Sequence, residues 1–195
     1  MDKKRIVIGV SGASGAPVAV ELLSFLKKCE AVESHLVISR GAEETIRQEC
    51  DLSPAEVAAL ADVTYDLNDI GAAVASGSFK TMGMIVVPAS MKTLAGLASG
   101  YSDNLLLRAA DVCLKERRRL VLAARESPLS SIHLRNMLTL SEAGAIILPL
   151  VLTFYNQPKE VRDMARHQVG KMLDLLGLDY PEFKRWDGGR GHDIS

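Results

Sequence analysis

Glycines and hydroxyl groups follow the first apolar run of the chain at a spacing suited to binding a phosphate or a flat ring. Gly12-Ala13-Ser14-Gly15 comes directly after Arg5–Val10, which reads as a buried strand. Glycines let the backbone approach a ligand closely, and amides at the start of the following helix can donate to an anion. The hydroxyls of Ser11 and Ser14 add donors. We therefore expect this turn to cradle a phosphate-bearing cofactor, with a plain tight turn as the alternative.

The residues around the turn discriminate between nucleotides. Gly9, Gly12 and Gly15 give G-x-x-G-x-x-G, whereas the dinucleotide fingerprint is G-x-G-x-x-G. An NAD protein usually has an acidic residue at the end of the second strand to hold the ribose hydroxyls, and this chain has Ser39-Arg40 there. NAD is disfavoured, and NADP stays open because Arg40 could meet a 2′-phosphate.

A match to the Tyr-x-x-x-Lys pair of short-chain reductases is interpreted as accidental. Tyr155 and Lys159 have the spacing, but Pro158 lies between them. Proline is best placed at the start of a helix, so Tyr155 is expected in the preceding loop and not above Lys159 on one helix face.

Basic side chains form a second group of candidates for binding an anion. Arg108 and Lys115 are seven residues apart on a predicted helix and therefore share a face. The strand-end segment Pro88-Ala89-Ser90-Met91-Lys92-Thr93 adds hydroxyls and a further cation. A solvated basic helix end that complements the helix dipole is the alternative for the run that begins at Lys115.

Arg125 and Glu126 directly follow a predicted strand, where charged side chains in an α/β sheet tend to face the ligand crevice. Arg125 could hold a phosphate through two hydrogen bonds. Glu126, if withdrawn from water, would suit the movement of a proton. The alternative is an exposed Arg–Glu ion pair worth less than ~1 kcal/mol.

Apolar strands alternate with helical patterns along the chain. Strands are expected at Arg5–Val10, His35–Ile38, Met84–Val87 (stopped by Pro88), Leu120–Ala123 and Ala145–Leu148. Helices are expected at Ala16–Lys28, Gly41–Glu49, Pro54–Leu60, Leu105–Lys115, Ser130–Ser141 and from Pro158 to about Leu176. This order predicts an α/β fold, a three-layer Rossmann-like sandwich around a doubly wound, mainly parallel sheet. Ligands of such sheets bind beyond the carboxyl ends of the strands.

Composition limits the class of protein. The 195 residues fit one domain, with about the last ten residues expected as a mobile tail. A net charge of −1 argues against nucleic acid or an anionic membrane as partner. Three widely spaced cysteines signal neither a disulfide framework nor a zinc site, so no metal is expected. No apolar run is long enough for a signal-peptide core or a membrane span, and a cytoplasmic location is expected.

Seven motifs in order, at matching separations, resemble the UbiX-type flavin prenyltransferases, a group that includes proteins labelled as phenolic-acid decarboxylase subunits. The motifs are Gly12-Ala13-Ser14-Gly15, His35-Leu36-Val37-Ile38-Ser39, Pro88-x-Ser90-x-x-Thr93, Arg108-Ala109-Ala110-Asp111-Val112, Leu114-Lys115-Glu116-Arg117-Arg118, Arg125-Glu126-x-Pro128 and Phe154-Tyr155-x-x-Pro158. The resemblance runs from Ile6 to about Trp186. Each motif alone is weak, and the ordered set is specific.

The resemblance implies a flavoprotein-like domain over residues 1–195 that joins the dimethylallyl group of dimethylallyl monophosphate to N5 and then C6 of reduced FMN. The product, prenylated FMN, would pass to a UbiD-type aromatic-acid decarboxylase. The family needs no metal and forms homododecamers with sites between subunits.

The resemblance also implies roles residue by residue. FMN would be contacted by Gly12, Ala13, Ser14, Ser39, Ser90, Met91, Lys92, Thr93 and Arg125. The dimethylallyl phosphate would be held by Arg108, Lys115, Tyr155 and Lys171, with Lys115 reaching in from a neighbouring subunit, and Trp186 would wall the prenyl pocket. Glu126 would handle a proton and Ser14 would orient the flavin, as the catalytic residues. Lys171 stands where some members have Arg, which keeps the charge but loses the two-pronged contact with phosphate.

Two alternatives stay open. An FMN-dependent cysteine decarboxylase of related fold would explain Pro88-Ala89-Ser90, although the early histidine and the Asn-rich flap segment of that group are not found. A non-catalytic flavin-carrying subunit would bind FMN without using Glu126.

Overall fold

The computed structural model describes residues 3–186 and 188. The tail that we expected at the carboxyl terminus falls mainly on residues 187 and 189–195, which lie outside the described residues.

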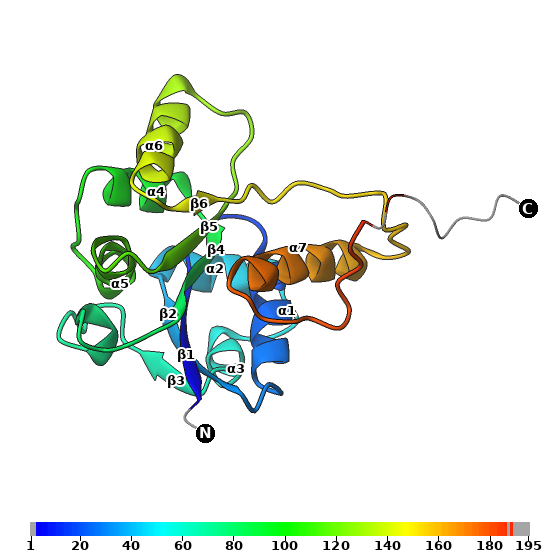
Figure 1. The fold of residues 1–195 in the computed structure, drawn as a ribbon, viewed down its shortest axis with the longest axis horizontal. Coiled ribbons are helices and arrows are strands. Elements are labelled where there is room, and N and C mark those ends of the chain that lie inside the picture. The colour runs from blue at the N-terminus through cyan, green and yellow to red at the C-terminus, as the bar shows by residue number, and fades with distance from the viewer. Residues whose placement is uncertain (1–2, 187, 189–195) are drawn as a thin grey trace, which may run out of the picture.

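Six parallel strands form one sheet in the order β3-β2-β1-β4-β5-β6 (Figure 1). The strands are β1 (Lys4–Val10), β2 (Val32–Ile38), β3 (Val63–Tyr65), β4 (Gly83–Ala89), β5 (Arg119–Ala124) and β6 (Ile146–Ile147). The predicted doubly wound α/β fold is confirmed. The strand order reverses between β1 and β4, and in open α/β sheets ligands bind at such a switch point.

Helices cover both faces of the sheet. They are α1 (Ala16–Leu26), α2 (Arg40–Glu49), α3 (Pro54–Ala58), the short 3-10 helix η1 (Ala73–Ala75), α4 (Met91–Ala98), α5 (Leu105–Lys115), α6 (Ser131–Glu142) and α7 (Val161–Leu175). Buried residues of α1, α2, α3 and α7 join one core cluster, and those of η1, α4, α5 and α6 join the other. The chain therefore has the three layers expected from its sequence.

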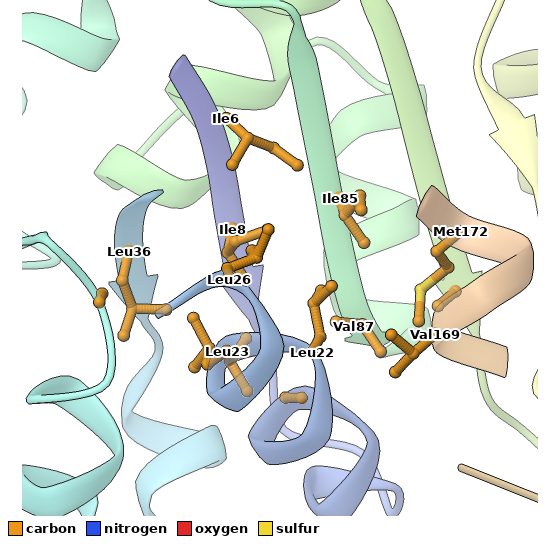
Figure 2. Packing of buried hydrophobic residues seen from close by; sticks show 14 of the residues in the cluster. Ile6, Ile8, Leu22, Leu23, Leu26, Leu36, Ile85, Val87, Val169 and Met172 are labelled. Carbon is orange, nitrogen blue, oxygen red and sulfur yellow. The ribbon is translucent and has the colours of Figure 1, made fainter. Parts of the chain in front are cut away.

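The two cores follow from the alternation of side chains along β1. Ile6 and Ile8 are fully buried on the α1 side, whereas Val7 belongs to the cluster on the α5 side. On the α1 side they pack with residues of three other elements, labelled in Figure 2: Leu22, Leu23, Leu26, Ile85, Val87, Val169 and Met172. Full burial of each large side chain contributes about 1.5–3 kcal/mol relative to exposure.

Two predicted boundaries at prolines are wrong. Pro88 does not stop β4, which continues to Ala89, and the register with β5 shifts between Val86 and Ala89. A proline without an N–H is tolerated at such an irregularity of the ladder. Pro158 does not open α7, which begins at Val161.

Three elements were missing from the prediction: β3, the 3-10 helix η1 and α4. β3 has only three residues, too few for a periodic pattern. α4 was assigned to a strand-end loop, yet Ser90 caps it and Leu94 and Leu97 anchor it in the core. Its small residues, such as Gly96, weaken the helical signal in the sequence.

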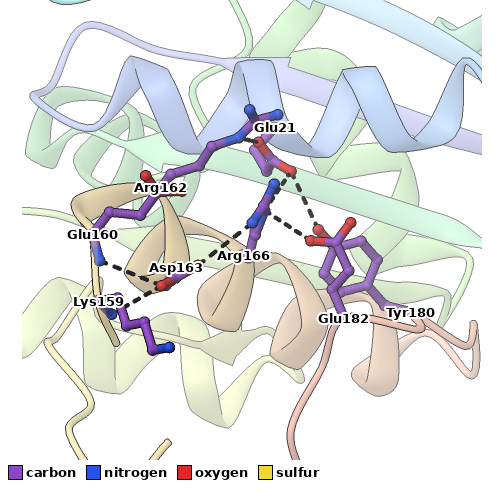
Figure 3. A network of polar contacts seen from close by, with 8 residues as sticks. All are labelled: Glu21, Lys159, Glu160, Arg162, Asp163, Arg166, Tyr180 and Glu182. Atoms are coloured by element: carbon purple, nitrogen blue, oxygen red, sulfur yellow. Dashed lines mark hydrogen bonds and ion pairs between the residues drawn. The ribbon is translucent and has the colours of Figure 1, made fainter. Parts of the chain in front are cut away.

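A polar network fastens α7 and the segment after it to α1 (Figure 3). The Glu21 carboxylate, whose side chain is 12% exposed, accepts hydrogen bonds from Arg162 Nε at 2.8 Å and from the Tyr180 hydroxyl at 3.3 Å. Arg166 Nε lies 3.5 Å from Glu21 and 2.8 Å from Glu182. Burial and the charge of Glu21 raise the pKa of Tyr180, so its hydroxyl stays protonated and donates. The network fixes the position of α7 over the sheet.

A buried histidine lies on the other face of the sheet. His35 of β2 is 3% exposed, and its Nδ1 lies 2.9 Å from the Tyr65 hydroxyl. Burial lowers the pKa of His35, with Arg5 acting in the same direction and Glu33 opposing it. The folded protein therefore holds this imidazole neutral.

This gives a pH dependence of stability. Because the folded pKa of His35 lies below the unfolded value of about 6.5, its stability contribution is complete above pH 6.5 and is lost as the pH falls toward the folded pKa. We expect the free energy of unfolding, measured with denaturant from pH 7 to pH 5, to fall less steeply in His35→Gln than in the parent. Equal slopes in the two proteins would contradict this prediction.

Candidate functional site

A cleft of about 500 Å³ opens at the carboxyl ends of the strands, beside the switch point between β1 and β4. It is lined by most of the residues that the sequence assigned to FMN, namely Gly12, Ser39, Ser90, Met91, Lys92 and Thr93, together with Glu126. These residues follow four different strands, so the sheet brings them together.

The helices α2 and α4 begin at this cleft, as does α5, whose cap Asn104 is also in the lining. Ser39 caps α2, where its hydroxyl accepts from the amide of Ala42 at 3.2 Å, and Ser90 caps α4. Arg40 and Lys92 lie in the first turns of these helices, where a cation is normally unfavourable. Neither cation has an ion-pair partner among the described residues. An anion in the cleft would make both positions favourable.

The turn after β1 lies directly against α2. A Cβ added at Gly12 would come within 2.8 Å of the backbone carbon of Gly41, so there is no room for a side chain between the two segments. This close approach brings the start of α2 to the switch point.

Ser11 has a structural use that differs from the one expected. Its buried hydroxyl donates to the carbonyl of Pro88 at 2.9 Å and accepts from the amide of Ser90 at 2.8 Å. The expectation that this hydroxyl faces a ligand is therefore wrong. Ser11 ties the turn after β1 to the end of β4 and the start of α4.

The amino terminus of α1 also differs from expectation. The amides of Gly15 and Ala16, which we expected to meet a phosphate, donate to one oxygen of Glu49 at 2.7 and 3.0 Å. Glu49, the last residue of α2, was missed by the sequence analysis. These partners are 33 and 34 residues apart in the chain, and no local pattern indicates such a contact.

Ser14 and Arg125 line a second cavity, of about 550 Å³, together with Glu49. Its other walls are mainly apolar and come from the segment Leu150–Leu152 and from α7. The Arg125 side chain forms no hydrogen bond or ion pair with any described residue, so the alternative of an Arg125–Glu126 ion pair is wrong.

Glu126 is exposed and lines the first cleft. One of its carboxylate oxygens accepts from the amide of Ser127 at 3.0 Å. Glu126 and Ser14 therefore lie in neighbouring cavities, on the two sides of the turn after β1.

Tyr155, Lys171 and Trp186 line a third cavity, of about 400 Å³, which shares Val151 and Gln168 with the second. The indole of Trp186 packs edge to face on the Tyr155 ring, with the ring centres 5.6 Å apart. Lys171 has no ion-pair partner among the described residues. Arg185 also lines this cavity, but it pairs with Asp174 at 2.6 Å. One unpaired cation, one phenol and an aromatic wall thus surround a space suited to a small anion with an apolar tail.

Three predicted residues are not brought to these cavities by a single chain. Ala13 lies in the turn after β1, Arg108 pairs with Asp111 at 2.9 Å, and Lys115 pairs with Glu116 at 2.6 Å. Leu107 lines the first cleft and Lys115 is eight residues further along α5, about 12 Å along the helix axis. Lys115 therefore lies toward the amino ends of the strands, away from the cleft.

Among residues 3–186 and 188, no three His, Cys, Asp or Glu side chains gather in a way that could hold a metal ion. Within that part no helix combines the length and apolar character needed to cross a bilayer. Cys29, Cys50 and Cys113 are free thiols.

The fold and the cleft define a flavin-binding class of α/β protein, and the profile of the Flavoprotein family matches residues 1–175. A probable UbiX-like flavin prenyltransferase from Streptomyces sp. (strain D7) is 54% identical over 186 residues, covering 95% of this chain and 93% of that protein. The chain therefore belongs to the Flavoprotein family and, within it, to the UbiX-like flavin prenyltransferases.

Solved structures agree with this assignment. The structure of AnUbiX (PadA1) in complex with FMN and dimethylallyl pyrophosphate superposes with a TM-score of 0.93 at 52% identity, covering 96% of this chain and 99% of that one. A dodecameric FMN-dependent UbiX-like decarboxylase from Escherichia coli O157:H7 gives 0.93 at 50% identity, with coverages of 94% and 100%. The FMN-dependent cysteine decarboxylase TvaF gives 0.61 at 17% identity over 75% of this chain and 90% of that one, which shows a shared fold alone.

Gly12 provides a test of the cleft. We expect Gly12→Ala to push α2 away from the turn, to cost about 1–3 kcal/mol of stability through overpacking, and to weaken FMN binding by about tenfold or more through displacement of the α2 terminus. Flavin fluorescence quenching and denaturant unfolding measure the two effects.

Gly71→Ala is the matched control, because a Cβ there meets nothing nearer than a side-chain oxygen of Asp69 at 3.6 Å. Undiminished FMN affinity in Gly12→Ala would show that the contact with α2 does not shape the site.

Proposed function

We propose that this protein is a flavin prenyltransferase that transfers the dimethylallyl group of a dimethylallyl phosphate to reduced FMN. The observation that carries the proposal is the arrangement of an anion-binding cleft and of cavities with apolar and aromatic walls around the turn after β1. A cleft with helix amino termini and two unpaired cations lies on one side of the turn after β1. The second cavity, lined by Ser14 and Arg125, shares Val151 and Gln168 with the cavity that contains Tyr155, Lys171 and Trp186.

The cleft residues fit FMN. Ser39 and Ser90, with the free amides of α2 and α4, would hold the phosphate, and Arg40 and Lys92 would balance its charge. Gly12 lines the cleft, and its lack of a side chain lets the start of α2 approach the turn. When bound in reduced form, FMN supplies the nucleophilic N5 and C6 atoms.

Residues of the third cavity would act on the phosphate donor. As the allylic C–O bond breaks, negative charge collects on the phosphate oxygens. The Lys171 ammonium and the Tyr155 hydroxyl are placed to stabilise that charge in the transition state. Trp186 and the apolar side chains near Val151 would exclude water from the allylic carbon.

Two further residues would complete the chemistry. Glu126 faces the cleft and would give a proton to the double bond of the prenyl group as the bond to C6 forms, and would then accept the proton that C6 loses. Ser14, in the second cavity, would orient the flavin by a hydrogen bond from its hydroxyl. Arg125, free of any described partner, would meet the flavin from the same side.

A homododecamer is part of the proposal. Exposed apolar side chains are grouped on α6 (Ile132, Leu134 and Leu138) and on the segment before α7 (Val151, Leu152 and Phe154). Surfaces of this kind mark interfaces between subunits. Assembly would also bring Lys115 and Arg108 of one copy to the third cavity of another.

The remaining parts of the proposal concern the cellular role. Residues 1–195 would act as one FMN-binding domain in the cytoplasm, where the three free thiols stay reduced. The product, prenylated FMN, would pass to a UbiD-type aromatic-acid decarboxylase.

Mass spectrometry of the extracted flavin tests the function. We expect incubation of the protein with reduced FMN and dimethylallyl monophosphate to add the mass of one dimethylallyl group to the flavin. A parallel reaction with the diphosphate identifies the preferred donor. An unchanged flavin mass with both donors, together with release of carbon dioxide from a cysteinyl peptide, would favour the cysteine decarboxylase.

Glu126→Gln separates an enzyme from a flavin carrier. A role in proton transfer predicts that prenylation slows by on the order of a hundredfold while FMN affinity is unchanged. Stopped-flow absorbance of the flavin and a binding titration measure these two quantities. A rate equal to that of the parent protein would remove Glu126 from the mechanism.

A further inference from the structure

His167 is a buried polar residue of α7 that contacts Tyr155. Its side chain is 7% exposed, and its Nε2 lies 3.4 Å from the Tyr155 hydroxyl. The two rings pack edge to face, with centres 5.4 Å apart and planes at 86°. Tyr155 therefore makes edge-to-face contacts with both His167 and Trp186.

The imidazole is neutral at ordinary pH. Burial lowers the pKa of His167, and the charge of Lys171, one turn further along α7, lowers it again. A neutral imidazole carries one proton, on either Nδ1 or Nε2. The position of that proton decides which way the hydrogen bond to Tyr155 runs.

The two tautomers have different consequences for Tyr155. With the proton on Nδ1, Nε2 accepts the phenol proton, and Tyr155 then has no proton to give to a phosphate. With the proton on Nε2, the imidazole donates to the phenol oxygen, and the Tyr155 hydroxyl is free to donate into the third cavity. A hydrogen bond received by the phenol oxygen also strengthens the one that the hydroxyl donates.

The surroundings of Nδ1 favour the second tautomer. Nδ1 is buried and has no hydrogen-bond partner among the described residues. Unpaired buried N–H groups are rarer in proteins than unpaired buried acceptors, because a polar hydrogen without an acceptor is costly to desolvate. Nδ1 is therefore better left as a bare lone pair, with the proton on Nε2.

We propose that His167 is a positioning residue for the phosphate donor: its Nε2–H holds the phenol oxygen of Tyr155, so that the phenol proton points at the donor phosphate. The proposal rests on the function proposed above, and His167, which also lines the third cavity, would act on the phosphate through the phenol of Tyr155. It also explains a buried polar side chain in an otherwise aromatic environment, where Phe183 packs 5.1 Å from its ring.

Substitutions at the two positions test the coupling. His167→Phe keeps the packing and removes the donor, so we expect KM for dimethylallyl monophosphate to rise about tenfold, with FMN affinity unchanged. His167→Gln can place an amide N–H near the position of Nε2 and should restore KM to within about threefold of the parent. In a Tyr155→Phe background, His167→Phe should have no further effect on KM.

An equal loss in both backgrounds would overturn the proposal, because a merely structural role does not depend on the phenol oxygen. His35→Phe is the matched control. It removes a buried histidine beside Tyr65 on the other face of the sheet and should change stability while KM stays the same.

Two readouts do not depend on turnover. Nitrogen NMR of the full chain should show neutral His167 protonated on Nε2, and a proton on Nδ1 would overturn the proposal. Calorimetric titration with inorganic phosphate should give weaker binding in His167→Phe than in the parent and in His167→Gln, and equal binding in all three would overturn it. If the parent protein binds phosphate in this pattern but does not prenylate FMN, the proposed function fails and the positioning role stands.

Discussion

The site depends on one close contact, between the turn after β1 and the start of α2. Gly12 and Gly41 meet backbone to backbone, and no other residue at position 12 fits without moving one of them. On the opposite side of the turn, Ser11 bonds to Pro88 and Ser90 and so fixes the start of α4. The amino termini of α2 and α4 converge on one cleft because both are held against the turn after β1, which has no side chain at Gly12. Anion binding in the cleft is therefore a property of this packing and not of any one side chain.

The same turn separates two environments. Gly12 lines the cleft that contains the cations and helix termini, whereas Ser14 and Gly15 line the second, mainly apolar cavity. In that cavity the Glu49 carboxylate accepts hydrogen bonds from the amides at the start of α1. A carboxylate at a helix amino terminus is well stabilised, so the start of α1 is not open to a phosphate. The phosphate of a bound flavin would be directed to α2 and α4 instead. A ligand that spans both environments would have its charged end in the first and its less polar end near the second.

Local patterns predicted the fold and the ends of the strands at which several candidate residues gather. Continuous apolar strands and short connections were enough to predict the parallel sheet. The topology of this sheet places Ser39, Ser90 and Glu126 at the carboxyl ends of the strands. Features that depend on contacts between distant segments were not predictable in this way. Glu49 bonds to residues more than 30 positions away, and Ser11 to a strand 77 positions further on. The boundary errors at Pro88 and Pro158 have a similar cause, since tertiary packing overrides what a proline dictates locally.

The charge balance of the third cavity argues that one chain holds only part of the phosphate site. A phosphate monoester carries a charge of about −1.5 to −2 near neutral pH, and the cavity offers Lys171 as its unpaired cation within the described residues. A lysine gives a point charge without the two-pronged geometry of arginine, so more donors are needed. Tyr155 supplies one if His167 orients its proton. Arg108, which is half-buried on α5, and Lys115, which is exposed at its end, do not line this cavity within their own chain. They would supply the remaining charge only across a subunit boundary. The apolar surfaces of α6 and of the segment before α7 would then be the means by which the site is completed.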